Sequence, residues 1–261
     1  MALFDRLGVV PGCRRPSGGL TTVFVPIHDD NPLRSIAAPY VTWGLIALNT
    51  AIFLLGLSEV GQASMASFAV VPDELRRGGI LGGPHGPGDL WPVPEPLTLL
   101  TYAFLHGDVL HLVTNMLFLW VFGDNVEDAL GHARFAIFYA LCAIAGGLAH
   151  ALATTLPEYP LIGASGAVAG VIAAYVLLHP HVRVWVLVLR VIPLNVTAAV
   201  ALGAWIVTQF VMLILGGPSL TAWWAHAGGI VAGAILIVVM RRPGTPLLSR
   251  ALPAKSGTKA E

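Results

Sequence analysis

The sequence predicts an all-α, polytopic membrane protein with a bundle of six transmembrane helices. Only 11% of its 261 residues are charged, 56% are hydrophobic, and the mean hydropathy is +0.78. A soluble domain has about a quarter charged residues. Six apolar runs approach the length that a membrane span requires. Acidic and basic residues balance at 14 each, so the net charge gives no reason to expect a nucleic-acid partner.

The N-terminal 38 residues are expected to form an irregular polar leader. Four prolines and the Gly18-Gly19 pair interrupt regular structure. We expect no cleavable signal or transit peptide, because residues 1–31 have no sustained apolar core and contain aspartates. Cys13 lies in this leader and Cys142 in an apolar run, so no disulfide between them is expected.

A long connection separates the first two predicted spans. Residues 41–57 can cross the ~30 Å hydrocarbon core with some tilt, and Asn49 within them is expected to hydrogen-bond to a neighbouring helix. Residues 58–97 are rich in Gly and Pro, which fits either an interfacial lobe beside a site or a mobile loop. Asp108 is a suitable N-cap for a second span over residues 109–122.

The remaining chain supplies four more spans. The third is expected over residues 133–154 and the fourth over residues 163–178. Residues 182–192 contain two arginines and are expected to lie at the membrane interface rather than to cross. The fifth span is expected over residues 193–215, with Pro193 as its first residue, and the sixth over residues 221–240.

The basic residues predict the orientation. With a cytosolic N-terminus, twelve Lys and Arg residues fall inside and only Arg76 and Arg77 fall outside, as the positive-inside rule favours. The chain is thus divided into a cytosolic leader (1–38), a six-helix membrane domain (39–240) and a cytosolic basic tail (241–261). We expect an integral protein of a bacterial cytoplasmic (inner) membrane.

Ser165 is the first candidate catalytic residue. It lies between Gly163 and Gly166 at the start of the fourth run. A helix over residues 163–178 would rise about 24 Å, less than the ~30 Å core. It should therefore begin below the extracytoplasmic surface, facing a cavity. A serine in an apolar helix often only bonds back to a carbonyl one turn earlier, so Ser165 needs a partner to be a nucleophile.

His226, early in the sixth run, is the candidate base for Ser165. Both runs carry a pair of glycines four residues apart, namely Gly166 and Gly170 in the fourth run and Gly229 and Gly233 in the sixth. Small residues at this spacing let two helix backbones approach closely. We therefore expect these helices to be neighbours and to bring His226 to Ser165.

Two residues of the second run are candidates for oxyanion stabilisation. His111 and Asn115 are four apart and share one helix face. They fit either donors to an oxyanion, together with the N–H groups that begin the fourth helix, or a polar pair joining helices. His106 lies just outside this run. Asn195 and Gln209 in the fifth run are expected to be packing polars.

A third catalytic residue is not evident. Every Asp and Glu lies in a connection, in the leader or tail, or at the cytosolic end of the second run. The residues therefore favour a Ser–His dyad over a triad, and they disfavour an aspartyl intramembrane protease. No H-E-x-x-H pattern occurs, so a metalloprotease of that type is not expected. A metal on His106, His111 and His226 fits less well than acyl transfer, so we expect no metal and no cofactor.

Three motifs in order resemble the rhomboid family of intramembrane serine proteases. They are His111-x-x-x-Asn115, Gly163-x-Ser165-Gly166 and Ala225-His226-x-Gly228-Gly229, and the resemblance covers about residues 41–240. It implies a Ser165–His226 dyad, and an oxyanion held by His111, Asn115 and the Ser165 amide. It also implies that the partners are the lipid bilayer and transmembrane protein substrates, cut near their extracytoplasmic end without a cofactor. His106 matches a histidine that family members often carry, and it is therefore a candidate auxiliary residue of the site.

The sequence departs from the family pattern at two places. Leu97-Thr98 stands where some members have Trp-Arg, so the resemblance does not extend to how the long first connection is anchored. Ala169 stands where some members have an aromatic that stacks on the histidine, so other packing must orient His226. The alternative function is a non-catalytic relative that binds membrane-protein clients. A transporter is disfavoured because the polar residues gather near one surface.

Overall fold

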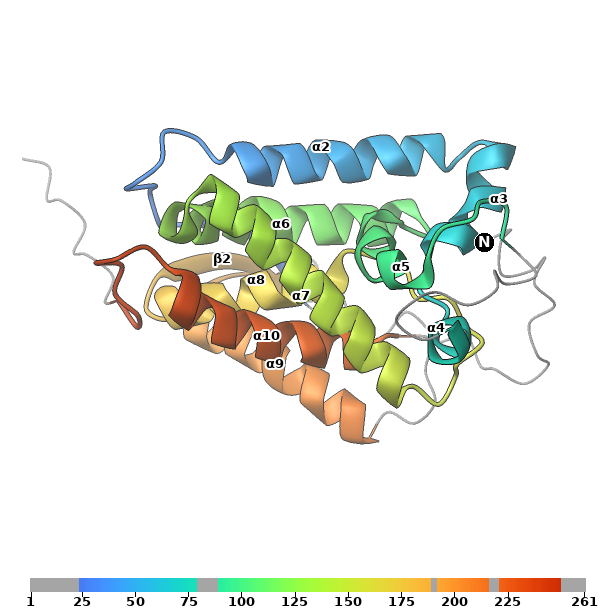
Figure 1. Cartoon of the computed structure of the whole chain (residues 1–261). Helices are drawn as coiled ribbons and strands as arrows, with labels where there is room; N and C mark the ends of the chain where they lie inside the picture. Colours follow the sequence, from blue (N-terminus) through green and yellow to red (C-terminus); the bar gives the residue numbers. More distant parts are fainter. Residues whose placement is uncertain (1–23, 79–88, 189–191, 216–220, 250–261) are drawn as a thin grey trace, which may run out of the picture.

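The computed structural model describes residues 24–78, 89–188, 192–215 and 221–249, and most of them are helical (Figure 1). Four helices in these residues are long and apolar enough to cross a membrane: α6 (Val109–Leu130), α7 (His132–Ala153), α9 (Ala198–Leu215) and α10 (Trp223–Met240). The first and fourth predicted runs form the shorter helices α2 (Tyr40–Leu55) and α8 (Ser165–Leu178). The expected count of six spans is therefore not confirmed.

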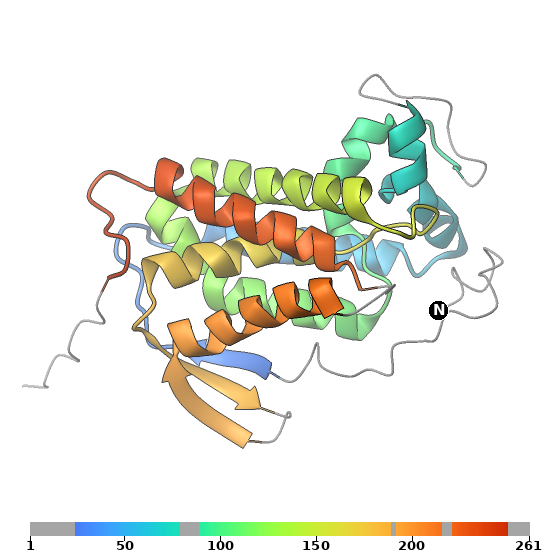
Figure 2. The ribbon, with the colours of Figure 1, turned by 90° about the horizontal axis from the view of Figure 1, so that it is seen from below.

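Helix α8 is the centre of the bundle. Its sequence is apolar all round, which is typical of a helix enclosed by others, and eleven of its 14 residues are buried. It contacts α6, α7, α9 and α10, and Figure 2 shows it between the red α10 and the orange α9. The helix is short because a turn at Gly163 precedes it and His179 ends it. Its N-terminus therefore lies inside the protein.

A three-stranded antiparallel sheet corrects the all-α prediction. Strands β1 (Phe24–Asp29), β2 (Arg183–Val188) and β3 (Ile192–Thr197) pair in the order β1-β2-β3. The leader therefore contains a strand, and the expected interfacial segment is β2 and the start of β3. Pro193 lies in β3, where an edge strand tolerates proline, rather than opening a span. Helix α9 begins five residues later, at Ala198.

The reason for the sheet is an alternation of buried and exposed residues in β2. Val184 and Val186 are buried, whereas Trp185 between them is 40% exposed. This period of two suits a half-buried strand of β-branched residues. Because the run is short and contains an arginine, it also fits an interfacial helix, and one of its two partner strands, β1, lies far away in the sequence.

Two acidic residues at the end of α6 fasten the start of α2. Helix α2 has no side-chain N-cap of its own. The Glu127 carboxylate accepts hydrogen bonds from the backbone N–H groups of Val41 and Thr42 and from the Thr42 hydroxyl. Asp128 accepts three more from the backbone of residues 34–36. The Glu127 bonds satisfy donors that a helix start leaves unpaired, and the Asp128 bonds hold the segment that leads into α2.

The long connection forms a packed helical lobe in its described part. It contains α3 (Glu59–Phe68), α4 (Pro72–Gly78) and α5 (Glu95–Thr101), followed by the short helix η1 (Tyr102–Phe104). The Ser67 hydroxyl accepts from the backbone of residues 90 and 91, which joins α3 to the segment before α5. The Gly-Pro cluster at residues 82–88 and Cys13 lie outside the described residues.

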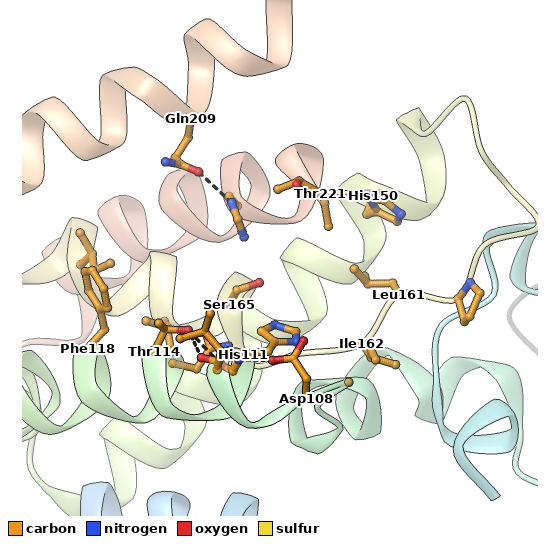
Figure 3. A pocket seen from close by; sticks show the side chains of 18 of the residues that line it. Asp108, His111, Thr114, Phe118, His150, Leu161, Ile162, Ser165, Gln209 and Thr221 are labelled. Atoms are coloured by element: carbon orange, nitrogen blue, oxygen red, sulfur yellow. Dashed lines mark hydrogen bonds between the residues drawn. The ribbon is translucent and has the colours of Figure 1, made fainter. Parts of the chain in front are cut away.

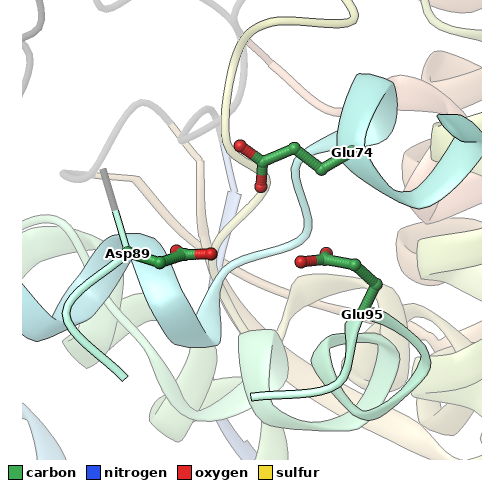
Figure 4. A group of neighbouring side chains, drawn as sticks. All are labelled: Glu74, Asp89 and Glu95. Carbon is green, nitrogen blue, oxygen red and sulfur yellow. The ribbon is translucent and has the colours of Figure 1, made fainter. Parts of the chain in front are cut away.

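This lobe brings together three carboxylates (Figure 4). Oxygen atoms of Glu74, Asp89 and Glu95 lie within 4.8 Å of one another, the one group with metal-ligand spacing found among the described residues. Burial, with Asp89 and Glu95 nearby, raises the pKa of Glu74 to about 7. Burial also raises the pKa of Glu95, which is 4% exposed. The Glu74 carboxyl is therefore partly protonated near neutral pH.

Candidate active site

Ser165 is the first residue of α8. Gly163, two residues before it, has φ +118°, a conformation that glycine adopts without strain. Ala164 at the N-cap has no side-chain hydrogen bond to offer, and the first helical bond runs from the N–H of Val168 to the carbonyl of Ala164. The N–H groups of the first helical turn therefore have no partner within the helix and lie at its positive end, beside the Ser165 hydroxyl.

Helices α8 and α10 touch backbone to backbone next to both dyad candidates. A Cβ built on Gly229 would lie 1.9 Å from the carbonyl oxygen of Gly166, and one on Gly233 would lie 2.3 Å from that of Gly170. Only glycine allows this approach. It places the chain neighbours of Ser165 and of His226 side by side, and both residues line one cavity of about 490 Å³ (Figure 3).

His226 is 9% exposed and has partners from two helices. Its Nδ1 lies 2.8 Å from Oε1 of Gln209 on α9, the hydrogen bond drawn from Gln209 in Figure 3. The rings of Trp205 and Trp223 lie 6.0 Å from the imidazole, one tilted and one edge-on. Gln209, Trp205 and Trp223 therefore hold the His226 ring, a role for which Ala169 has no aromatic side chain.

His111 and Asn115 line the same cavity as Ser165. Asp108 is the N-cap of α6, as expected, and accepts from the N–H of His111. Asn115 is buried and donates one amide hydrogen to the His111 carbonyl, which leaves its second hydrogen for the cavity. A Cβ on Gly163 would come within 2.6 Å of the His111 ring, so the glycine makes room for that ring.

His106 lies outside the cavity that holds Ser165. It is fully buried, its ring is edge-on to that of His111 at 5.0 Å, and it lines a separate cavity of about 230 Å³ that α2 and α3 border. Neither ring nitrogen has a hydrogen-bond partner in the described part of the chain. Burial lowers the pKa of His106 to about 3, so the ring is neutral. The His111 ring is its contact with the residues that line the Ser165 cavity.

Sequence reasoning missed two residues of the cavity. Gln209 was expected to be a packing residue, yet it bonds to His226. His150 of α7 also lines the cavity and is 9% exposed. No local motif marks either residue, because each acts on a cavity built from other helices. Asn49 is buried too, and its amide nitrogen donates to the carbonyl of Leu45 in its own helix.

Comparison with known proteins gives the family. The Rhomboid domain profile matches residues 93–243. RHOMBOID-like protein 12, mitochondrial, of Arabidopsis thaliana is 26% identical over 226 residues, which are 80% of this chain and 61% of that protein. Rhomboid protease GluP of Bacillus subtilis is 31% identical over 52% of this chain and 24% of its own length. Inactive rhomboid protein 1 of Drosophila melanogaster is 31% identical over 35% of this chain and 7% of its own.

The matches span at most 61% of these relatives' own length, and the relatives include a protease and an inactive protein. They therefore identify a shared membrane domain rather than an activity. The profile match covers more than half of the 261 residues and includes Ser165, His226, His111 and Asn115. On this ground the chain belongs to the rhomboid family.

Proposed function

We propose that this protein is an intramembrane serine endopeptidase that cleaves transmembrane segments of other membrane proteins near their extracytoplasmic end. One observation carries the proposal: Ser165, at the uncapped start of α8, and His226 line one cavity where α8 and α10 meet backbone to backbone. A nucleophile, a base and N–H donors at the same place are the requirements of acyl transfer.

The proposed reaction begins when Nε2 of His226 takes the proton of the Ser165 hydroxyl. The Ser165 oxygen then bonds to the scissile carbonyl carbon, and the carbonyl oxygen becomes an oxyanion. The Ser165 N–H, the Asn115 amide and His111 are its proposed donors. His226 next gives its proton to the leaving nitrogen as the C–N bond breaks. Water, deprotonated by His226, hydrolyses the acyl-enzyme and restores Ser165.

The proposal also concerns the depth of Ser165 in the membrane and the membrane in which the protein resides. Because α8 is too short to cross the core and Ser165 is only partly buried, water has a route to the hydroxyl. The cytosolic location of both termini stays a prediction from the basic residues. The relative from Arabidopsis is mitochondrial, and so the relatives do not support an assignment to a bacterial inner membrane.

The second candidate is a client-binding protein without catalysis, which the inactive Drosophila relative favours. A fluorophosphonate probe separates the two without knowledge of the substrate. We expect the probe to label the purified protein in proteoliposomes and not the Ser165→Ala variant. A folded wild-type protein that resists labelling, together with intact binding of a membrane-protein client, would support the second candidate instead.

A further inference from the structure

Gln209 is a buried amide on a helix that is otherwise little enclosed. Only 17% of the most apolar window of α9 is buried, against 44% to 50% for α6, α7 and α10. Gln209 is one of three buried residues of α9, with Ala198 and Leu202, and is 3% exposed. An amide in an apolar region is costly unless its hydrogen bonds are satisfied. The hydrogen-bond partners of Gln209 therefore explain why an amide is buried at this point of α9.

The two ends of the Gln209 amide are fixed by their partners. The amide nitrogen donates to the carbonyl oxygen of Trp205 at 3.0 Å. Because a backbone carbonyl can only accept, the nitrogen must face Trp205 and the amide oxygen must face His226. The oxygen accepts, so Nδ1 of His226 is the nitrogen that carries hydrogen. In the neutral ring, Nε2 is then free to accept a proton.

We propose that Gln209 is the positioning residue of the His226 base, a role that rests on the proposed protease function. It selects the Nδ1–H tautomer and fixes the ring about its Cβ–Cγ bond. Trp205 and Trp223 pack against the ring but do not choose between tautomers. Gln209 takes the place of the acid in a Ser-His-Asp triad, without the negative charge that would stabilise the imidazolium.

This role makes the base depend on α9. His226 is on α10. Its hydrogen bond to Gln209 joins α10 to α9 between residues that are 17 positions apart in the chain. A displacement of α9 by the length of a hydrogen bond would release Nδ1 and allow the inactive tautomer. The proton-accepting form of His226 therefore predominates only while α9 is in place.

The test uses the full-length protein in detergent and in proteoliposomes. The variant Gln209→Leu removes the acceptor at similar volume. Gln209→Glu keeps one, because a protonated carboxyl can donate to Trp205 and still accept from His226. Thr208→Ala is the matched control on the same helix, since among the described residues the Thr208 hydroxyl bonds to the Ala204 carbonyl alone and does not line the cavity.

Two readouts are taken. The ¹⁵N shifts of the His226 ring, assigned by comparison with His226→Ala, should report Nδ1–H in the wild type and a mixture of tautomers in Gln209→Leu. For a reporter transmembrane substrate, Gln209→Leu should lower kcat about ten- to a hundredfold at nearly unchanged KM, a smaller loss than the ~10⁴-fold of a triad with the wrong tautomer. Gln209→Glu should lose less, and Thr208→Ala should match the wild type.

Each outcome decides the inference. A wild-type ring that carries hydrogen on Nε2 would overturn it even if Gln209→Leu does not fold. An active wild type whose tautomer and kcat are unchanged in Gln209→Leu would also overturn it, while the protease function would stand. A folded wild type that neither binds the fluorophosphonate probe nor cleaves the reporter would instead reject the protease function, and with it any catalytic role for Gln209.

Discussion

The Gly229 backbone of α10 lies against the carbonyl oxygen of Gly166 on α8, at a distance that leaves no room for a side chain. The same relation holds one turn further along between Gly233 and Gly170. Because Ser165 and His226 are three or fewer residues from this contact, the separation of the two helices sets the distance between nucleophile and base.

The first prediction is that Gly229→Ala damages both stability and activity. The added methyl would lie 1.9 Å from a backbone oxygen, so α8 and α10 must move apart. Overpacking of this kind costs about 1–3 kcal/mol, and sometimes more. Thermal unfolding in detergent should show a lower Tm, and probe labelling of Ser165 should slow.

The matched control for this variant is Gly203→Ala on α9. A Cβ there would meet no other element within 4 Å in the described part of the chain, and alanine favours a helix over glycine by about 1 kcal/mol. Its Tm should stay equal or rise. Equal unfolding curves for Gly229→Ala and Gly203→Ala would contradict the close packing of the two helices.

A second prediction concerns the dyad. Ser165→Ala and His226→Ala should each abolish cleavage of a reporter transmembrane substrate in proteoliposomes, and the double variant should be no worse than either one, because the two residues act as a unit. Cleavage is measured by gel or mass spectrometry, and circular dichroism checks the fold. Full activity in either single variant would reject the dyad.

A third prediction concerns Asn115, whose second amide hydrogen is available to an oxyanion in the cavity. Asn115→Ala should lower kcat by about 10²-fold, on the order of 3 kcal/mol, as the loss of one oxyanion donor does elsewhere. KM for the reporter should change little. A loss confined to KM would assign Asn115 to substrate binding instead.

Local patterns predicted most helices but not the sheet. Asp108 marks the start of α6 because an aspartate N-cap acts on N–H groups only a few residues away. Strand β2 depends on β1, whose residues lie more than 150 positions earlier. Without that partner, its short run of alternating valines beside an arginine also fits an interfacial helix. The capping of α2 by Glu127, across 85 residues, was likewise beyond any local pattern.

The same distinction between local motifs and long-range contacts holds for the residues of the candidate site. Ser165, His226 and the four packing glycines stand in short motifs, so the sequence could name them. Gln209 could not be named, because its amide is one of several polar groups in apolar runs and only the folded bundle shows which one meets His226. His106 was named from its spacing, yet burial behind His111 keeps it from the cavity.

A fourth prediction concerns the carboxylate cluster of the lobe. In the folded protein the pKa of Glu74 is raised from 4.5 to about 7 by burial and by Asp89. The folded lobe therefore binds this proton more tightly than the unfolded chain does. Its contribution to stability is fully present below the ordinary value of 4.5 and is lost as the pH rises through about 7.

Hydrogen exchange of α4 and α5 at a series of pH values across this window measures the effect, after correction for the intrinsic pH dependence of exchange. Protection should fall as the pH rises, and Glu74→Gln should flatten the profile, because an amide does not ionise. Glu59→Gln, which alters an exposed carboxylate of α3 outside the cluster, should keep the wild-type slope. An ionised Glu74 beside Glu95 adds repulsion that proton uptake relieves. A rise in protection with pH in the wild type would therefore contradict the raised pKa of Glu74 in the folded lobe.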